Sequence, residues 1–392
     1  MTTLTDTSRW LGVGYSDDPD PKAAGTAAAD TALREADPKL LMVFCSDSYD
    51  LEALLAAINE RSGGVPLIGC STAGQIGPSG PGDASVVITA LGGSGFSVST
   101  AVATGVSSRL RESGAEVAAC IQALDSRPHQ VLMLLSDALG GDQQEVIRGA
   151  YGVAGAGIPL VGGCAGDDFK MQGTYQFYGN RVLQDAVVGA GIGSDAPLGI
   201  GVHHGWRKVG EPVLVTRSGG NRVFTLDDRP ALDVYLERHS APDEAHTDET
   251  AFNSFAITRP LGLSRRSAEE GVRLVAGADF GDRSLSLIAE VPQDGLAWFM
   301  EGDVDSVLEA TDRACEAAIG AIGDRRPLGL LTFDCAARRG VLGDEGISRE
   351  VERVTRQADG APIAGFYSYG EIARTSGVSG FHNQTIVVLA VS

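Results

Sequence analysis

Three glycine-containing loops hold the residues of this chain that could bind a ligand. Each loop follows a proline and two small or apolar residues, and the copies lie at 65–75, 158–167 and 361–371. Glycine permits backbone conformations and close approaches that other residues do not. A strand that opens into such a loop therefore leaves backbone N–H groups that can bind a carboxylate. With Glu371 as a negative charge for an ammonium group, the loops predict a site for an amino acid or a similar small zwitterion.

The candidate ligand contacts come from the first and third loops. They combine hydroxyl groups, glycines and one carboxylate: Ser71, Thr72, Gly74, Ser368, Tyr369, Gly370 and Glu371. Arg338 lies just past an apolar run and could pair with a ligand carboxylate, or with Glu345 or Glu350 nearby. The alternative interpretation is that the glycines only permit tight strand exits, in which case the loops are structural.

Cysteines and histidines suggest two other classes of protein. Cys335 or Cys164 could act as the nucleophile of an enzyme, and Cys335 with His382, or Ser71 with His204, can be drawn as a nucleophile–base pair. His204 or His382 could serve as the single axial ligand of a haem. The chain has no CxxC pair and no CxxCH attachment motif. Because the loops are more specific than these pairs, the residues favour a binding protein without a resident metal over an enzyme.

The elements that must position these loops repeat along the chain. Apolar runs at 40–45, 131–135 and 328–333 precede helical patterns at 51–61, 143–154 and 348–357, and Ala-rich helical patterns precede the runs. Short apolar runs next to helical patterns indicate β-α-β units. We predict an α/β protein with two lobes and mixed sheets, built by duplication of a unit that reads strand, helix, strand, helix, glycine loop, strand.

The repeated unit predicts the domain organisation. The first lobe would span 8–195 with two units, 8–92 and 95–193, and the third unit would span 285–392. Residues 196–284 do not fit the unit and would form a divergent connecting segment. Within it, 213–224 reads as a hairpin, and 229–238 as a helix with Pro230 in its first turn. The predicted second lobe combines this segment with the third unit.

Composition excludes several partners. The formal net charge of the 392 residues is −20, which argues against binding to nucleic acid, because that binding depends on neutralising phosphates with Lys and Arg. No run of about 18 apolar residues could span a membrane. Residues 1–8 are polar and lack a signal-peptide pattern. We therefore expect a cytoplasmic protein with reduced thiols.

The motifs resemble one known family, the FIST domains. Residues 333–338 and 362–372, with 382–385, resemble the FIST C domain, and the string Gly365-Phe366-Tyr367-Ser368-Tyr369-Gly370-Glu371 is the most specific part. Residues 67–74, the turn at 204–206 and the segment 226–232 resemble the FIST N domain. The resemblance covers nearly the whole chain.

The resemblance implies a sensory module of signal transduction that binds a small ligand such as an amino acid. By motif match, Tyr369, Gly370 and Glu371 become candidate ligand contacts, with Arg338 as a companion. Some relatives look like haem-based nitric oxide sensors that act on histidine kinases, which keeps a haem sensor as an alternative function. In either case, the resemblance implies action through a separate signalling protein.

Overall fold

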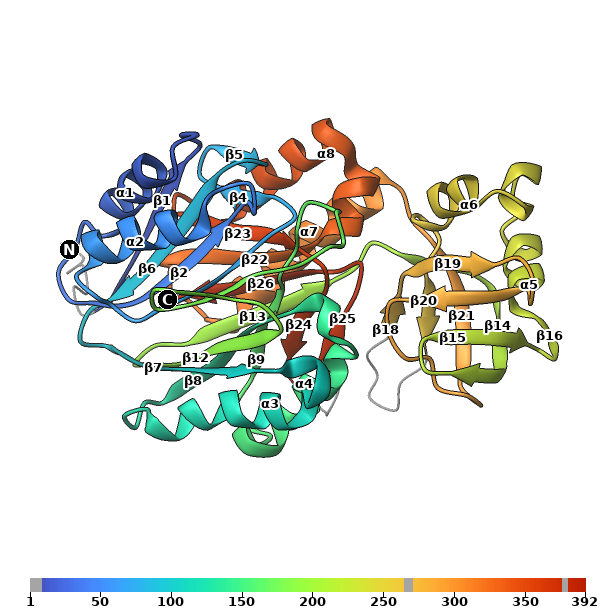
Figure 1. The fold of residues 1–392 in the computed structure, drawn as a ribbon, viewed down its shortest axis with the longest axis horizontal. Helices are drawn as coiled ribbons and strands as arrows, with labels where there is room; N and C mark the ends of the chain where they lie inside the picture. The colour runs from blue at the N-terminus through green and yellow to red at the C-terminus, as the bar shows by residue number, and fades with distance from the viewer. Residues whose placement is uncertain (1–8, 264–270, 376–379) are drawn as a thin grey trace.

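The computed structural model describes residues 9–263, 271–375 and 380–392 and shows two lobes joined by two short linkers (Figure 1). The first lobe contains three units of mixed sheet and helix, and the second lobe is formed by residues 207–301. The α/β class and the division into two lobes agree with the prediction, but the third unit lies in the first lobe, whereas the sequence placed it in the second.

Each unit of the first lobe has the same order of elements. The first unit comprises β1 (Trp10–Ser16), α1 (Pro21–Ala32), β2 (Pro38–Cys45), α2 (Leu51–Ser62), β3 (Leu67–Ser71), β4 (Gln75–Gly77), β5 (Gly80–Gly82) and β6 (Val86–Gly92). The second comprises β7 (Phe96–Thr104), α3 (Leu110–Ala118), β8 (His129–Ser136), α4 (Gln143–Ala154), β9 (Leu160–Cys164), β10 (Gln176–Tyr178), β11 (Arg181–Leu183) and β12 (Ala186–Ser194). The third comprises β13 (Leu198–His203), α7 (Val304–Ala321), β22 (Gly329–Cys335), α8 (Ala336–Gln357), β23 (Ile363–Ser368), β24 (Glu371–Arg374), β25 (Phe381–His382) and β26 (Ile386–Val391). The common origin of the units by duplication stays a prediction.

The hairpin that follows each glycine loop leaves its own unit. β4–β5 of the first unit extends the sheet of the third unit at β23, β10–β11 of the second extends the first at β3, and β24–β25 of the third extends the second at β9. Each sheet of the first lobe is therefore completed by a hairpin from another unit. The exchange closes a ring, so that no unit has a complete sheet without its neighbours.

The three units share one apolar core. Phe44 from the first unit contacts Phe333 and Phe366 from the third, with ring centroids 6.3 and 4.6 Å apart. Met133 and Val188 of the second unit belong to the same buried cluster. The helices cover the outer faces of the sheets (Figure 1), and Asp side chains at 20, 50, 142 and 303 cap α1, α2, α4 and α7.

The second lobe is one antiparallel sheet with helices on one side. It comprises β14 (Arg207–Gly219), β15 (Arg222–Leu226), β16 (Arg229–Pro230), α5 (Ala231–Arg238), α6 (Glu249–Ala256), β17 (Leu261–Leu263), β18 (Gly271–Arg273), β19 (Val275–Asp279), β20 (Ser284–Leu287) and β21 (Leu296–Glu301). β14 and β15 pair as the predicted hairpin, and α5 begins directly after Pro230. A separate buried cluster that includes Tyr235, Phe252 and Phe299 forms its core.

The observed units differ from the predicted domain boundaries. β21 and all but the first residue of β20 fall within the range 285–392 but lie in the sheet of the second lobe, and the first strand of the third unit is β13 at 198–203. The second lobe therefore interrupts the third unit between β13 and α7. The sequence pattern alone does not reveal this interruption. Alternation of apolar and polar residues identifies a strand, but it does not identify the sheet that the strand joins. Within the described residues, no helix is long and apolar enough to cross a membrane.

Candidate functional site

The three glycine loops meet one another at one end of the first lobe. Ala73 N donates to Tyr367 O at 2.9 Å, Gly166 N to Ser71 O at 3.0 Å, and Tyr369 N to Cys164 O at 3.2 Å. Each bond joins a loop to the loop of another unit, so the three bonds form a cycle. Backbone N–H groups that were expected to face a ligand therefore hold the loops together. We call this region the loop junction, comprising residues 71–75, 164–167 and 367–371.

The structure brings the predicted ligand contacts together at the loop junction, but it buries most of them. Ser71, Thr72, Ser368 and Glu371 are at most 1% exposed, Gly74 and Gly370 are buried, and Tyr369 is half-buried. The Ser71 hydroxyl donates to Gly166 O at 2.7 Å, and Thr72 Oγ1 accepts from the Gln75 amide at 2.6 Å. A ligand could reach these groups only if the loops separated.

Glu371 lies at the centre of this buried network without a cation in direct contact among the described residues. Its Oε1 accepts from the Ser368 hydroxyl at 2.7 Å, and its Oε2 accepts from the Thr385 hydroxyl at 2.9 Å and the Thr385 N–H at 3.3 Å. Burial raises the pKa of Glu371 to about 8. Near neutral pH the side chain is therefore largely a neutral acid, which weakens its attraction for an ammonium group.

Arg338 is committed to two carboxylates inside the third unit. It lies in the first turn of α8, and its Nε donates to Asp334 at 2.7 Å while its Nη2 donates to Glu350 at 2.5 Å. All three side chains are at most 1% exposed. The pairing with Glu350 is one of the two alternatives that the sequence left open. The two carboxylates accept from neighbouring nitrogens of one guanidinium group and therefore lie close together. Burial, and next the negative charge of Glu350, raise the pKa of Asp334.

The second unit differs from the others by a longer segment between its glycine loop and its hairpin. Asp167 accepts from the backbone N–H groups of Met171, Gln172 and Gly173 and from the Tyr369 hydroxyl. The N–H of Phe169 donates to the same hydroxyl at 2.6 Å. Tyr369 therefore ties the third loop to the extended segment of the second, which fixes the outer edge of the loop junction.

The candidate nucleophiles are poorly placed for reaction. All six cysteines are buried, and burial, with the charge of Glu371 as a second cause, raises the pKa of both Cys164 and Cys335. A thiolate is the reactive form of cysteine, so these environments oppose nucleophilic attack.

The two candidate haem ligands are engaged within the protein. His382 is 6% exposed, and its Nε2 lies 2.9 Å from Ala373 O. His204 Nδ1 accepts from the Trp206 N–H at 3.3 Å. Across the described residues, no group of three His, Cys, Asp or Glu side chains is arranged to hold a metal ion. Each contact engages one ring nitrogen, Nε2 of His382 and Nδ1 of His204.

A partly open cavity of about 150 Å³ lies between the lobes. Its lining comes from the start of α4 in the first lobe and from β17, β18 and the segment 289–296 in the second: Asp142, Gln144, Arg148, Leu263, Arg273, Ala289, Glu290, Pro292, Gly295 and Leu296. We call it the inter-lobe cavity. Two arginines, two carboxylates and several apolar side chains therefore face one small space, and Arg273 is only 5% exposed. Arg148 also pairs with Glu145, and Arg273 donates to the backbone carbonyls of Val272 and Glu290.

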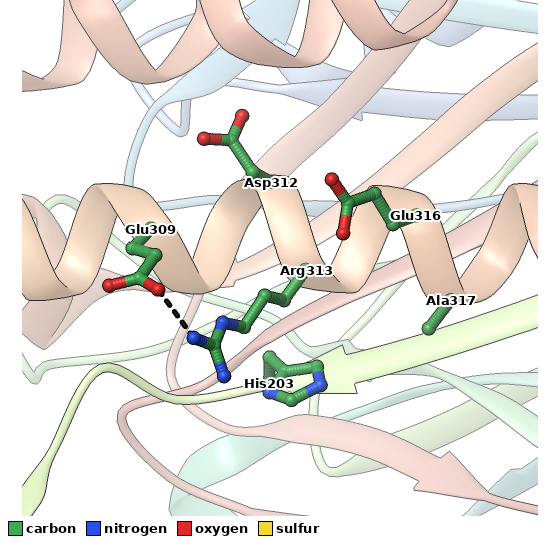
Figure 2. A pocket seen from close by; sticks show the side chains of 6 residues that line it. All are labelled: His203, Glu309, Asp312, Arg313, Glu316 and Ala317. Carbon is green, nitrogen blue, oxygen red and sulfur yellow. Dashed lines mark hydrogen bonds and ion pairs between the residues drawn. The ribbon is translucent and has the colours of Figure 1, made fainter.

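A larger hollow on the outer face of α7 is less suited to binding. Figure 2 shows His203, Asp312, Arg313 and Glu316 along the helix and strand, with Glu309 bonded to Arg313. Asp312 is in turn bonded to Arg353. The hollow is open to solvent, and ion pairs within the protein already occupy part of its charge.

Comparison with known proteins identifies the family. Residues 39–229 match the FIST N domain, and residues 231–374 match the FIST C domain. The chain belongs to the FIST family. The two matches meet between β16 and α5, inside the second lobe, so the boundary between FIST N and FIST C does not coincide with the boundary between the lobes.

Three relatives of this FIST protein are described as uncharacterized proteins. One from Mycobacterium tuberculosis strain H37Rv is 25% identical over 387 residues, which cover 96% of this chain and 97% of the relative. Another, from Mycobacterium bovis, is 25% identical over 235 residues, or 58% of this chain and 59% of the relative. A third, from Methanocaldococcus jannaschii, is 32% identical over 80 residues, or 20% of this chain and 16% of the relative. FIST domains are sensor domains of signal transduction. The names of these three relatives mention no ligand.

Reasoning from the sequence of this FIST protein missed the residues of the inter-lobe cavity. Arg148 lies in an ordinary amphipathic helix that Asp142 caps, Arg273 lies in the segment 196–284 that did not fit the repeat, and Glu290 lies near the start of the predicted third unit. No spacing links residues 142–148 with 263–296, because only the docking of the lobes brings them together. The one available signal was general, since ligand sites are frequent where domains meet.

Proposed function

We propose that this FIST protein is a cytoplasmic sensor that binds a small zwitterion, such as an amino acid, in the inter-lobe cavity. Arg148 and Arg273 would attract the carboxylate, and Asp142 and Glu290 would attract the ammonium group. Leu263, Pro292 and Leu296 offer an apolar surface for the rest of the molecule. The protein would act by binding rather than catalysis, and it would pass its signal to a separate protein such as a histidine kinase.

The observation that carries the proposal is the mixture of opposed charges in a small cavity between the lobes. A cavity of about 150 Å³ is smaller than the roughly 300–1,000 Å³ typical of drug-sized ligands, so it favours a small molecule. Residues from both lobes line it. A ligand there would favour one arrangement of the lobes over others, which is how a binding event becomes a signal.

The inter-lobe cavity suits a ligand better than the loop junction does. At the junction, backbone N–H groups, hydroxyls and Glu371 already bind one another, and the side chains are buried. A ligand would have to replace those bonds and to separate three units that share a core. In the cavity, Leu296 is 44% exposed, so solvent already reaches the space.

Filling the cavity tests the site. Leu296 lies directly opposite Leu214 in the β14–β21 pair, and Leu214 is 39% exposed but does not line the cavity. The variants Leu296→Trp and Leu214→Trp therefore make the same change on neighbouring strands, one inside the cavity and one outside. Thermal unfolding is measured for each with a panel of amino acids, small carboxylates and amines.

A ligand at about 100 times its dissociation constant should stabilise the wild type by about 2.7 kcal/mol. We expect the Leu214→Trp variant to respond like the wild type, and Leu296→Trp to lose most of the response. An equal response in both variants would show that the ligand binds outside the cavity. A wild type that responds to no member of the panel would contradict the proposed ligand class.

A further inference from the structure

We propose that Trp206 and Gln384 form a latch that fixes the second lobe against the first and thereby sets the width of the inter-lobe cavity. The latch itself is a property of the fold. Its effect on ligand binding rests on the function proposed above.

Both linkers between the lobes meet at Trp206. This residue lies on the first linker, between β13 and β14, and its side chain is 4% exposed. Gly302 lies on the second linker, and a Cβ atom placed there would come within 2.5 Å of the Trp206 ring. The ring therefore packs directly on the backbone of the returning chain, and it belongs to a buried cluster with Met300 of the second lobe and Ile386 of the first.

Gln384 joins this point to the body of the second lobe. Its backbone carbonyl accepts from Trp206 Nε1 at 2.9 Å, and its amide Nε2 donates to Ile257 O at 2.8 Å. Ile257 follows the last residue of α6, so the bond satisfies one of the carbonyls that a helix end leaves without an internal partner. One residue of the first lobe thus contacts a linker and a helix of the second lobe at once.

The backbone of Gln384 is held in an uncommon conformation. Its φ is +55°, and its side chain is 0% exposed. A left-handed conformation is unfavourable at a residue other than glycine and persists where the surroundings impose it. The next residue, Thr385, donates twice to Glu371 at the loop junction. The latch is therefore anchored on the most buried part of the first lobe.

The second lobe connects the latch to the wall of the inter-lobe cavity. β17 follows α6 after residues 257–260 and ends at Leu263, which lines the cavity. β17 pairs with β21, where Leu261 lies opposite Phe299 and Leu263 opposite Ala297, the residue after Leu296. Movement of Ile257 away from Gln384 would therefore carry two lining residues, Leu263 and Leu296, with it.

Removing the bonds of the latch one at a time tests the proposal without a ligand. Trp206→Phe removes the indole donor, and Gln384→Leu removes the amide, including an Oε1 that has no hydrogen-bond partner among the described residues. Gln384→Asn is a second variant at that position: it keeps an amide and tolerates a left-handed backbone, but its shorter side chain does not reach Ile257. Trp298→Phe, at a tryptophan of β21 that stacks with Lys208, is the matched control.

Hydrogen exchange is measured across the intact chain of each variant. We expect amides of 257–263 to exchange about tenfold faster in the Trp206 and Gln384 variants, in keeping with the loss of one or two net hydrogen bonds. Amides of β22 and β26 should exchange as in the wild type, and Trp298→Phe should change neither set. Exchange at 257–263 within twofold of the wild type in all latch variants would overturn the proposal, as would faster exchange throughout the first lobe.

Measuring the affinity for L-leucine distinguishes a latch that sets the cavity width from a contact that only stabilises the fold. If the latch sets the cavity width, Trp206→Phe and Gln384→Leu should weaken L-leucine binding at least fivefold while the unfolding midpoint of the first lobe stays unchanged. Unchanged affinity beside faster exchange would contradict the effect on the cavity. If the wild type binds neither L-leucine nor any other member of the panel, the proposed function fails, and the exchange experiment alone decides the latch.

Discussion

The third unit of the first lobe carries charged side chains at positions where the other two units carry neutral ones. Where the exchanged hairpins join the next sheet, Gln75 lies opposite Phe366, Gln176 opposite Cys70, and Glu371 opposite Gly163. All three hairpin residues are 0% exposed. Similarly, the strand ends paired with the glycine loops hold Cys45, Ser136 and Asp334. Equivalent sites therefore differ in charge but not in burial.

The first unit shows what kind of side chain the Glu371 site accommodates. Gln75 donates to the Thr72 hydroxyl and accepts from the Ser85 hydroxyl and N–H. Glu371 meets a serine and a threonine at the corresponding positions, Ser368 and Thr385. A protonated carboxyl group, like an amide, offers one donor and one acceptor, whereas an ionised carboxylate only accepts. Burial, which the neutral Gln75 shares at the equivalent position, raises the pKa of Glu371 and does not involve a ligand.

Breaking the charge balance of the third unit should have the largest effect. Arg338→Met removes the cation between Asp334 and Glu350, which leaves buried carboxylates without a positive partner. Loss of one partner of a buried ion pair typically costs about 3–5 kcal/mol. We expect the free energy of unfolding in urea to fall by about that amount.

The matched control for Arg338→Met neutralises the whole group. The triple variant Asp334→Asn, Arg338→Met, Glu350→Gln should recover most of the lost stability, because replacing a complete buried ion group is often neutral. Equal losses in the single and triple variants would show that packing of the Arg338 side chain, rather than charge, holds α8 in place.

The comparison with Gln75 also predicts a pH dependence. Because the pKa of Glu371 is raised from 4.5 to about 8, the folded chain binds this proton more tightly than the unfolded chain. Its contribution to stability is complete below the ordinary pKa and is lost as the pH rises through about 8, by up to about 1.4 kcal/mol per pH unit. Glu371→Gln should remove this slope and stabilise the chain most at alkaline pH.

Urea unfolding of the wild type and of Glu371→Gln between pH 5 and 9 measures the difference. Asp334, whose pKa is also raised, is present in both proteins, so the difference isolates Glu371. A difference that does not change with pH would mean that Glu371 is ionised in the folded chain, and that its site is unlike that of Gln75.

Much of the first lobe could be predicted from its sequence, because the signals are local. Apolar runs, Ala-rich helices and glycine loops recur with the order of the elements, and the loops do converge. The exchange of hairpins left no such signal, since the three-residue strands β4, β10 and β11 are too short for a pattern. The sequence also did not reveal what the backbone N–H groups of the loops bind. The same residues are required whether these groups donate to another loop or to a ligand.

The extended segment of the second unit gives a smaller prediction. Tyr369→Phe removes the hydroxyl that donates to Asp167 and accepts from Phe169 N–H. Asp167 keeps its three backbone donors, so we expect a loss of about 1.5 kcal/mol in thermal unfolding, the low end of the range for one hydrogen bond to a charged group. The first and third loops meet through backbone bonds and should not change, which exchange at Ala73 and Tyr367 would test. Faster exchange at both would show that Tyr369 supports the whole loop junction.

The smallest effect is expected for an ion pair at the outer edge of the same segment. Lys170 of the second unit contacts Asp47 of the first at 2.7 Å, but the Lys170 side chain is 46% exposed. Exposed pairs contribute about 0–1 kcal/mol and weaken with salt, so Lys170→Ala should change the unfolding free energy by less than about 1 kcal/mol at low salt and by less still at 1 M NaCl. A loss comparable to that of Arg338→Met would mean that the surface of the second unit, and not the buried charges of the third, holds the units together.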